Sequence, residues 1–148
     1  MFRTKIAALR LAAGAAIVWR LLPAPAAAAD GYKLVINAAN PVTSLDRREA
    51  SAIFLRRSTR WPDGTPVMAV DGPDSPAREA FSKDVHGKKA ASIRSHWLQV
   101  IFSGRGVPPP EKASDSDVIL YVETHPGAIG YVASATATDD VKVLKVTP

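Results

Sequence analysis

The chain has 148 residues, contains no cysteine, and carries 19 Lys and Arg residues against 14 Asp and Glu residues. The lack of cysteine excludes disulfides, thiol catalysis and thiolate metal sites, so packing alone has to stabilise the fold. A formal net charge of +5 is typical of proteins that bind nucleic acid or a membrane surface. The position of the charges along the chain argues against both partners.

The segment 1–29 has the pattern of a signal peptide. Three basic side chains precede position 11, residues 11–19 are apolar, and residues 27–29 are Ala-Ala-Ala, which fits a cleavage site. The alternative is a transmembrane anchor, but Arg20 interrupts a run that would need about 20 apolar residues. We therefore expect cleavage before Asp30 and a periplasmic or secreted protein.

Cleavage would remove most of the excess positive charge. Four basic residues and no acidic ones lie in the predicted signal: Arg3, Lys5, Arg10 and Arg20. The mature chain, residues 30–148, would have 15 basic and 14 acidic residues, a net charge of +1. Its 119 residues correspond to one domain. Nucleic acid is not an expected partner, and contact with a membrane would occur only through another protein.

The first predicted elements are a strand and a helix. Residues 33–37 form a short apolar run that indicates a buried strand. Ser44 is a predicted N-cap for a helix over residues 45–55, with Leu45, Ala52 and Ile53 on its inner face. A basic cluster, Arg-Arg-Ser-Thr-Arg at residues 56–60, follows the end of this helix.

The arginines of residues 56–60 have two interpretations. A solvated helix end is favoured, because cations complement the negative end of the helix dipole. A site for an anion or a partner is the alternative. Residues 61–64, Trp-Pro-Asp-Gly, predict a turn with Trp61 packed beneath it; an exposed tryptophan would instead suggest protein docking.

The middle of the chain predicts a strand, a loop and two helices. A strand over residues 66–70 leads into a loop over residues 71–74. Ser75 and Pro76 are the expected N-cap and first residue of a helix that buries Ala77, Phe81 and Val85 and ends at Gly87. A further helix over residues 90–102 has one apolar stripe: Ile93, Trp97, Val100 and Ile101.

The remainder predicts a connector, a helix and two strands. Residues 103–113 contain two glycines and three consecutive prolines, which indicates a semi-rigid surface loop. A helix follows over residues 118–124, with Val118, Tyr121 and Val122 inward, and strands over 128–132 and 141–146. Alternation of strands and helices favours a layered α/β fold in which part of the sheet is parallel.

Several segments together resemble the phosphate-binding-protein-like branch of the type 2 periplasmic binding proteins, which deliver solutes to ABC transporters. They are Val-Ile-Asn at 35–37, Asn-Pro-Val at 40–42, Ile-Phe-Leu at 53–55, Arg-Trp-Pro-Asp at 60–63 and Pro-Gly-Ala-Ile-Gly-Tyr-Val at 126–132. The resemblance runs from about Lys33 to Val146. It implies one lobe of a receptor that normally has two, with a mixed central sheet flanked by helices.

The resemblance also implies where a ligand would bind. In phosphate receptors the ligand loop resembles Arg-x-x-x-Ser-Gly-Thr with a Phe six positions after the Ser. Aligned on Phe81, Ser75 matches the serine, but Asp71, Pro76 and Ala77 replace the arginine, glycine and threonine. Ser75 then has a simpler explanation as a helix cap.

The candidate ligand-binding residues are Asp71, Asp74, Ser75 and Arg78. An Arg78–carboxylate pair that orders the loop is favoured; a ligand site is the alternative, and two aspartates suit an amine better than phosphate. No catalytic motif, cofactor site or metal spacing is expected: His86, His96 and His125 are not paired for a metal ion. The sequence therefore favours a non-catalytic binding module for a solute, anion or transporter component. The alternative is an envelope protein-interaction module whose ligand loop is degraded.

Overall fold

The computed structural model describes residues 31–148. The predicted signal peptide, residues 1–29, lies outside the described residues. The strands are β1 Tyr32–Ile36, β2 Ser44–Asp46, β3 Met68–Ala69, β4 Ala128–Ala133 and β5 Lys142–Thr147. The helices are α1 Arg47–Phe54, α2 Pro76–Phe81, the π-helical turn η1 Ser82–His86, α3 Ala90–Phe102 and α4 Asp115–Thr124.

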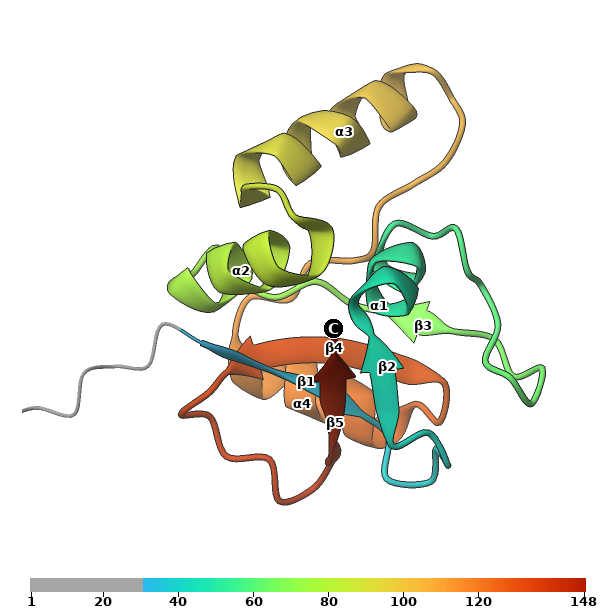
Figure 1. Ribbon diagram of the computed structural model, residues 1–148, viewed down its shortest axis with the longest axis vertical. Helices are drawn as coiled ribbons and strands as arrows, with labels where there is room; N and C mark the ends of the chain where they lie inside the picture. Colours follow the sequence, from blue (N-terminus) through green and yellow to red (C-terminus); the bar gives the residue numbers. More distant parts are fainter. Residues whose placement is uncertain (1–30) are drawn as a thin grey trace, which may run out of the picture.

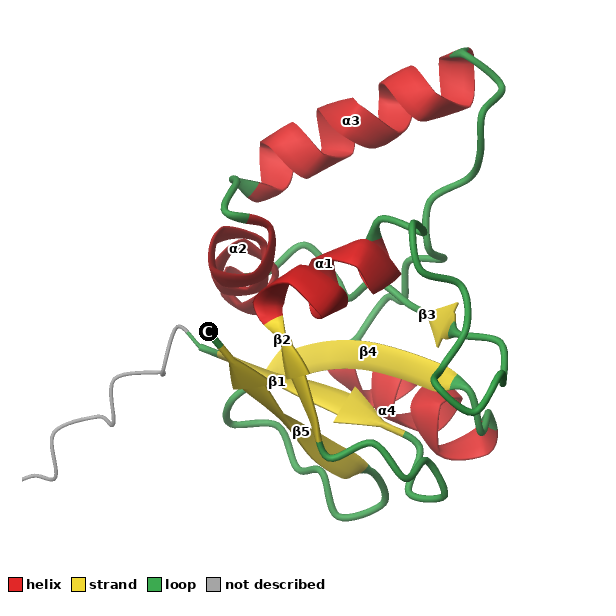
Figure 2. Cartoon of the chain, turned by 45° about the vertical axis from the view of Figure 1, so that its right-hand side comes forward, coloured by secondary structure: helices red, strands yellow, loops and turns green. Residues whose placement is uncertain are grey.

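The strands form one mixed sheet in the order β2-β5-β1-β4-β3. β1 lies antiparallel to both β4 and β5, whereas β2 is parallel to β5 and β3 is parallel to β4. Helices cover both faces: α4 lies against one, and α1 with α2 lies on the other (Figures 1 and 2). The predicted fold class, an α/β layered structure with a partly parallel sheet, is confirmed.

Two hydrophobic clusters hold these layers together. On the α1 and α2 side, Phe54 and Phe81 pack edge to face at 4.7 Å between ring centroids, and Phe81 stacks on Tyr131 at 4.1 Å. On the other side, Val118 and Val122 of α4 are fully buried against the sheet. Burial of such side chains contributes about 1.5–3 kcal/mol each, which makes these clusters the main source of stability.

The start of α1 differs from the prediction. Ser44 and Leu45 belong to strand β2, and the N-cap is Asp46, whose carboxylate accepts a hydrogen bond from the Glu49 backbone N–H at 2.7 Å. Glu49 bonds back to the Asp46 N–H at 3.0 Å, which completes a capping box. The prediction chose the wrong one of two capable caps, because pairing with β5 keeps residues 44–46 extended.

The helix that follows the ligand loop begins and ends as predicted. Ser75 caps α2, Pro76 occupies its first turn, and the buried side chains are Ala77, Phe81 and Val85. Gly87 terminates the helical segment with φ +65°, a conformation that glycine adopts without steric cost. The change from α-helix to π-helix at Ser82 had no sequence signal.

Helix α3 has the predicted bounds but not the predicted burial. Of the expected inner stripe only Trp97 is buried, and Ile101 is 45% exposed. Figure 1 shows why: α3 stands beyond α1 and α2, away from the sheet, so only part of its surface meets the rest of the domain. The connector over residues 103–113, predicted to be irregular, then returns to the sheet without helix or strand.

The turn after α1 packs against the turn before β4. Trp61 is 4% exposed, and its Nε1 donates to the Gly127 carbonyl at 3.0 Å. The prediction that Trp61 lies beneath its turn is confirmed, so it is not an exposed docking residue. Gly127 lies so close to the Pro66 carbonyl that a Cβ atom there would sit 2.2 Å from its oxygen.

Candidate functional site

The candidate ligand loop joins β3 to α2 and is already hydrogen-bonded internally. The Ser75 Oγ accepts a hydrogen bond from the Arg78 backbone N–H at 3.3 Å. Pro76 has no backbone N–H to offer an anion. Ser75 therefore serves α2 as the cap that the sequence predicted.

Arg78 is held by two carboxylates. Its Nη2 lies 2.6 Å from Asp71 Oδ2, and its Nη1 lies 3.0 Å from Glu111 Oε2. The side chain is only 12% exposed. The pKa of Arg78 is raised, because the neighbouring carboxylates outweigh the burial that opposes its charge. The guanidinium thus forms the Arg78–carboxylate pair that the sequence favoured, and Glu111 adds a second carboxylate to it.

Asp71 joins this cluster to the sheet. Its side chain is 19% exposed and accepts a hydrogen bond from the Tyr131 hydroxyl of β4. Burial raises the pKa of Asp71, while the Tyr131 hydroxyl and the Arg78 charge act in the opposite direction. Burial, followed by the Asp71 charge, raises the pKa of Tyr131. The Tyr131 hydroxyl therefore stays protonated at neutral pH and keeps its hydrogen bond to Asp71.

Glu111 is the residue of this cluster that sequence reasoning missed. It belongs to the connector, which lies beside the ligand loop: the Asp71 N–H donates to the Pro110 carbonyl at 2.8 Å, and the Lys112 N–H donates to the Asp71 carbonyl at 2.9 Å. Arg78 and Glu111 lie far apart in the sequence, so their pairing carries no local signal. The proline run was the nearest clue, since it predicts a stiff segment able to hold a side chain in place.

Asp74 lies apart from the other predicted site residues. Its carboxylate is 77% exposed and is 3.7 Å from the Arg94 guanidinium of α3. An exposed pair of this kind contributes about 0–1 kcal/mol. Of the four predicted residues, the structure brings Asp71 and Arg78 together, uses Ser75 as a cap, and leaves Asp74 on the surface.

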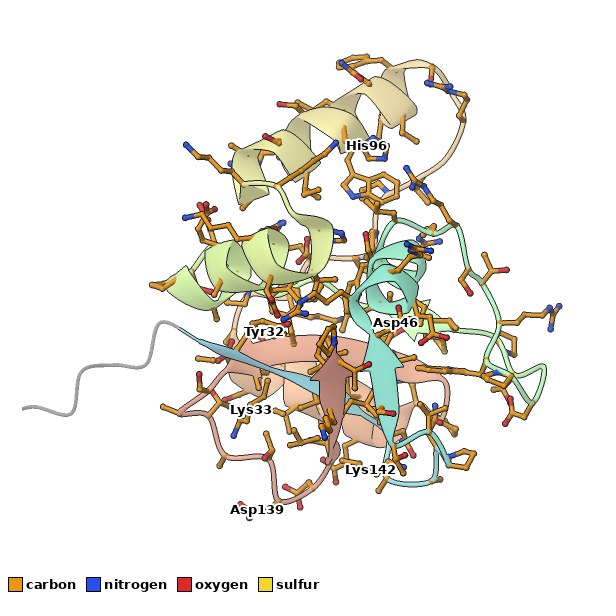
Figure 3. All side chains as sticks on the ribbon, viewed as in Figure 1. Tyr32, Lys33, Asp46, His96, Asp139 and Lys142 are labelled. Carbon is orange, nitrogen blue, oxygen red and sulfur yellow. The ribbon has the colours of Figure 1, made fainter. Side chains whose placement is uncertain are left out.

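A cleft of about 320 Å³ opens beside Arg78, between α3 and the proline-containing connector. Its apolar wall is formed by Trp97, Leu98 and Ile101, and its polar lining includes Arg94 and Glu111. Figure 3 shows side chains that project from α3 toward the helices below it, His96 among them. The volume lies at the low end of the about 300–1,000 Å³ common for ligand pockets.

The three histidines lie in separate surroundings. His86 Nδ1 is 2.8 Å from Ser51 Oγ, and burial, assisted by nearby positive charge, lowers its pKa to about 4. His125 stacks on Tyr121, and His96 lies edge to face with Trp97. Within residues 31–148 no three metal-ligating side chains are grouped to hold an ion. In the same part of the chain, no helix has the length and apolar character to cross a membrane.

Comparison with known proteins shows the family. Residues 19–146 match the model of the PBP superfamily domain. The chain therefore belongs to this family of periplasmic-binding-protein domains, whose members bind substrates rather than transform them. No curated protein is similar enough to the chain to match it.

Several solved structures share this fold. A putative phosphate ABC transporter substrate-binding protein from Clostridium perfringens, solved with bound phosphate, has a TM-score of 0.61 and 23% identity over 78% of this chain and 44% of its own. An ABC-type phosphate transport receptor from Vibrio cholerae has a TM-score of 0.54 and 19% identity, over 78% of this chain and 46% of its own. PstS from Borrelia burgdorferi has a TM-score of 0.55 and 15% identity, over 78% of this chain and 47% of its own. The chain spans less than half of each, which corresponds to one lobe.

Proposed function

We propose that the protein is an exported, non-catalytic binding module that takes an organic amine in the cleft beside Arg78. Family membership supports a binding role, and the signal-like segment 1–29 supports export. The observation that carries the choice of ligand is the engagement of Arg78 by Asp71 and Glu111. A guanidinium with two carboxylates at 2.6 and 3.0 Å has little capacity left for a phosphate ion.

The cleft itself favours an amine with an apolar body. Glu111 uses Oε2 for Arg78 and is 56% exposed, which leaves Oε1 without a partner among residues 31–148. Opposite it, Trp97 and Leu98 offer an apolar wall. An ammonium group can pair with the Glu111 carboxylate while the apolar part of the ligand covers this wall. The cations of the lining, Arg78 and Arg94, already face carboxylates, so inorganic phosphate would compete with those carboxylates for them and would leave the wall uncovered.

Tight binding would require a second surface. Ligand pockets commonly bury about 70–90% of a small ligand, and an open cleft on one lobe covers less. We infer that a second lobe, supplied by another copy of this chain or by a transporter component, completes the pocket. Weak binding by the isolated module is therefore the expected result.

The test is a melting-temperature and calorimetric comparison of defined probes. Phenethylamine should bind, 2-phenylethanol should not because it lacks the charge, and ethylamine should bind more weakly because it lacks the ring. Millimolar phosphate should cause no shift, whereas a ligand at about 100 times its dissociation constant would add about 2.7 kcal/mol. The variant Glu111→Gln should lose the amine response. A phosphate-induced shift that Arg78→Met abolishes would overturn the proposal.

An envelope protein-interaction module is the second candidate, and one observation favours it. Leu98, Ile101 and Phe102 of α3 are 49%, 45% and 87% exposed, which is unusual for three large apolar side chains so close together in one helix. A photoreactive amino acid at position 98 should then crosslink one specific envelope protein in intact cells. A chain that remains uncrosslinked at position 98 would remove this candidate.

A further inference from the structure

A second groove, distinct in composition from the cleft, lies between the end of α1 and α3. It encloses about 500 Å³ and is bordered by residues 55–59, by α3 and by the start of the connector. Its polar lining includes Arg56, Arg57 and Arg105, and no acidic residue lines it. Figure 3 shows His96 on the side of α3 that faces this groove. We call it the basic groove.

The three arginines of the basic groove have no acidic partner among residues 31–148. Arg47, Arg78 and Arg94 each pair with a carboxylate. Arg105 donates through Nε to Ser103 Oγ at 2.9 Å, which leaves its two terminal amino groups available. Three guanidinium groups thus face one groove without neutralising charge.

The backbone places one of these arginines in a conformation that normally favours glycine. Arg56 has φ +56° and is the single non-glycine residue of positive φ among residues 31–148. The Arg56 N–H bonds to the Ile53 carbonyl at 3.0 Å, and the Arg57 N–H bonds to the Ala52 carbonyl at 2.8 Å. These two bonds define a Schellman motif, in which glycine is the usual residue at the left-handed position. An arginine there tolerates a strain that glycine would avoid.

The positive field of this groove reaches a neighbouring histidine. Burial is the largest cause that lowers the pKa of His86, and the charges of His96, Arg57 and Lys88 act in the same direction. His96 and Arg57 line the groove, so part of this smaller, electrostatic effect comes from the groove itself. A negatively charged occupant would relieve that repulsion.

The floor of the groove is apolar and narrows the choice of occupant. Trp97, Val100 and Val107 contribute to the lining, and Val107 is 62% exposed. A free inorganic anion would satisfy the arginines but leave these side chains in water. A protein segment that alternates carboxylates with apolar side chains would cover both kinds of surface, since arginine and aromatic residues dominate the binding energy of many protein interfaces.

We propose that the basic groove binds an acidic segment of a partner protein, with Arg56, Arg57 and Arg105 pairing to its carboxylates and the apolar floor receiving its hydrophobic side chains. This site is separate from the amine cleft, although Trp97 borders both. It does not depend on the proposed amine ligand, so failure at one site leaves the other intact.

The experiment measures fluorescence anisotropy of a labelled decapeptide that contains four glutamates and three leucines. The parent domain should bind it, and binding should weaken as salt rises. The informative variant is Arg56→Gly, because glycine fits the positive φ of this position and the melting temperature should stay level or rise. Affinity should fall about three- to tenfold for Arg56→Gly, Arg57→Gln or Arg105→Gln.

The controls separate this site from general charge attraction. Arg48→Gln removes an exposed arginine of α1 that does not line the groove, and it should bind like the parent. The matched peptide with glutamine in place of glutamate should not bind. Equal affinity of the groove variants and Arg48→Gln would overturn the proposal. Binding of the glutamine peptide would overturn it too, as would tighter binding of a dodecamer of deoxythymidylate.

Discussion

Removal of the Arg78 guanidinium should destabilise the domain and show that its ion-pair cluster is structural. The side chain is 12% exposed and bonds to Asp71 and Glu111 at 2.6 and 3.0 Å. Bonds to charged groups contribute about 1.5–3 kcal/mol each, and the pair with the half-exposed Glu111 has to be discounted for solvent screening. Arg78→Met should therefore cost about 3 kcal/mol of unfolding free energy, or about 10 °C in melting temperature.

A double-mutant cycle in urea makes this measurement specific. Asp71→Asn keeps the shape of the side chain and an acceptor for the Tyr131 hydroxyl, so it should cost about 1–2 kcal/mol. The double variant should lose less unfolding free energy than the two single variants together, with a coupling energy of about 1–2 kcal/mol. Arg94→Met is the matched control: its pair with Asp74 is exposed and 3.7 Å long, so the loss should stay below about 0.5 kcal/mol.

Two results would refute this reasoning. One is an unfolding free energy of Arg78→Met within about 0.5 kcal/mol of that of the parent. The other is a cycle in which the losses of the two single variants add up to the loss of the double variant. The first would mean that Arg78 contributes little to stability, and the second that its contribution does not depend on Asp71; either would favour the ligand-site interpretation of the loop.

Three further predictions concern the core and the pH response. Gly127→Ala should cost about 2–4 kcal/mol, because its Cβ would lie 2.2 Å from the Pro66 carbonyl oxygen; a melting temperature unchanged within about 2 °C would contradict the close approach. Asn37→Ala should cost about 2–3 kcal/mol in urea denaturation, since its Nδ2 donates to the Val122 and Glu123 carbonyls at the end of α4; a cost below about 0.5 kcal/mol would be inconsistent with this cap. His86 has a pKa of about 4 when folded against 6.5 when unfolded, so the unfolded chain binds more protons between these values. Stability should therefore fall as pH drops from about 7 to 5, by about 1–2 kcal/mol after discount for partial exposure, and His86→Asn should flatten this slope.

Local signals predicted those parts of the fold that neighbouring residues decide. Ser75, Pro76 and Gly87 fixed both ends of one helical segment, because capping and positive φ depend on a few consecutive residues. The same logic chose Ser44 over Asp46 at α1. Both can cap a helix, and the choice between them depends on the parallel pairing of β2 with β5, which lies at the other end of the domain's sequence.

The candidate site was predictable only in part for the same reason. Asp71 and Arg78 are close in sequence, at either end of a tight loop, and their pairing followed from that proximity. Helix α3 shows a second limit of prediction from sequence. Its apolar stripe predicted burial, but its position beyond α1 and α2 leaves Ile101 exposed. Periodicity indicates which residues can face a core and says nothing of whether a neighbour is there.

The sequence by itself determined the α/β class, most element positions and the family resemblance, because these follow from capping, apolar periodicity and short motifs. It also determined that the loop of residues 71–78 departs from the phosphate-receptor pattern. Only the tertiary structure decided that Glu111 completes the Arg78 cluster, and that Arg56, Arg57 and Arg105 face one groove. These groups come from segments far apart in the chain, and the register of the sheet and the path of the connector bring them together.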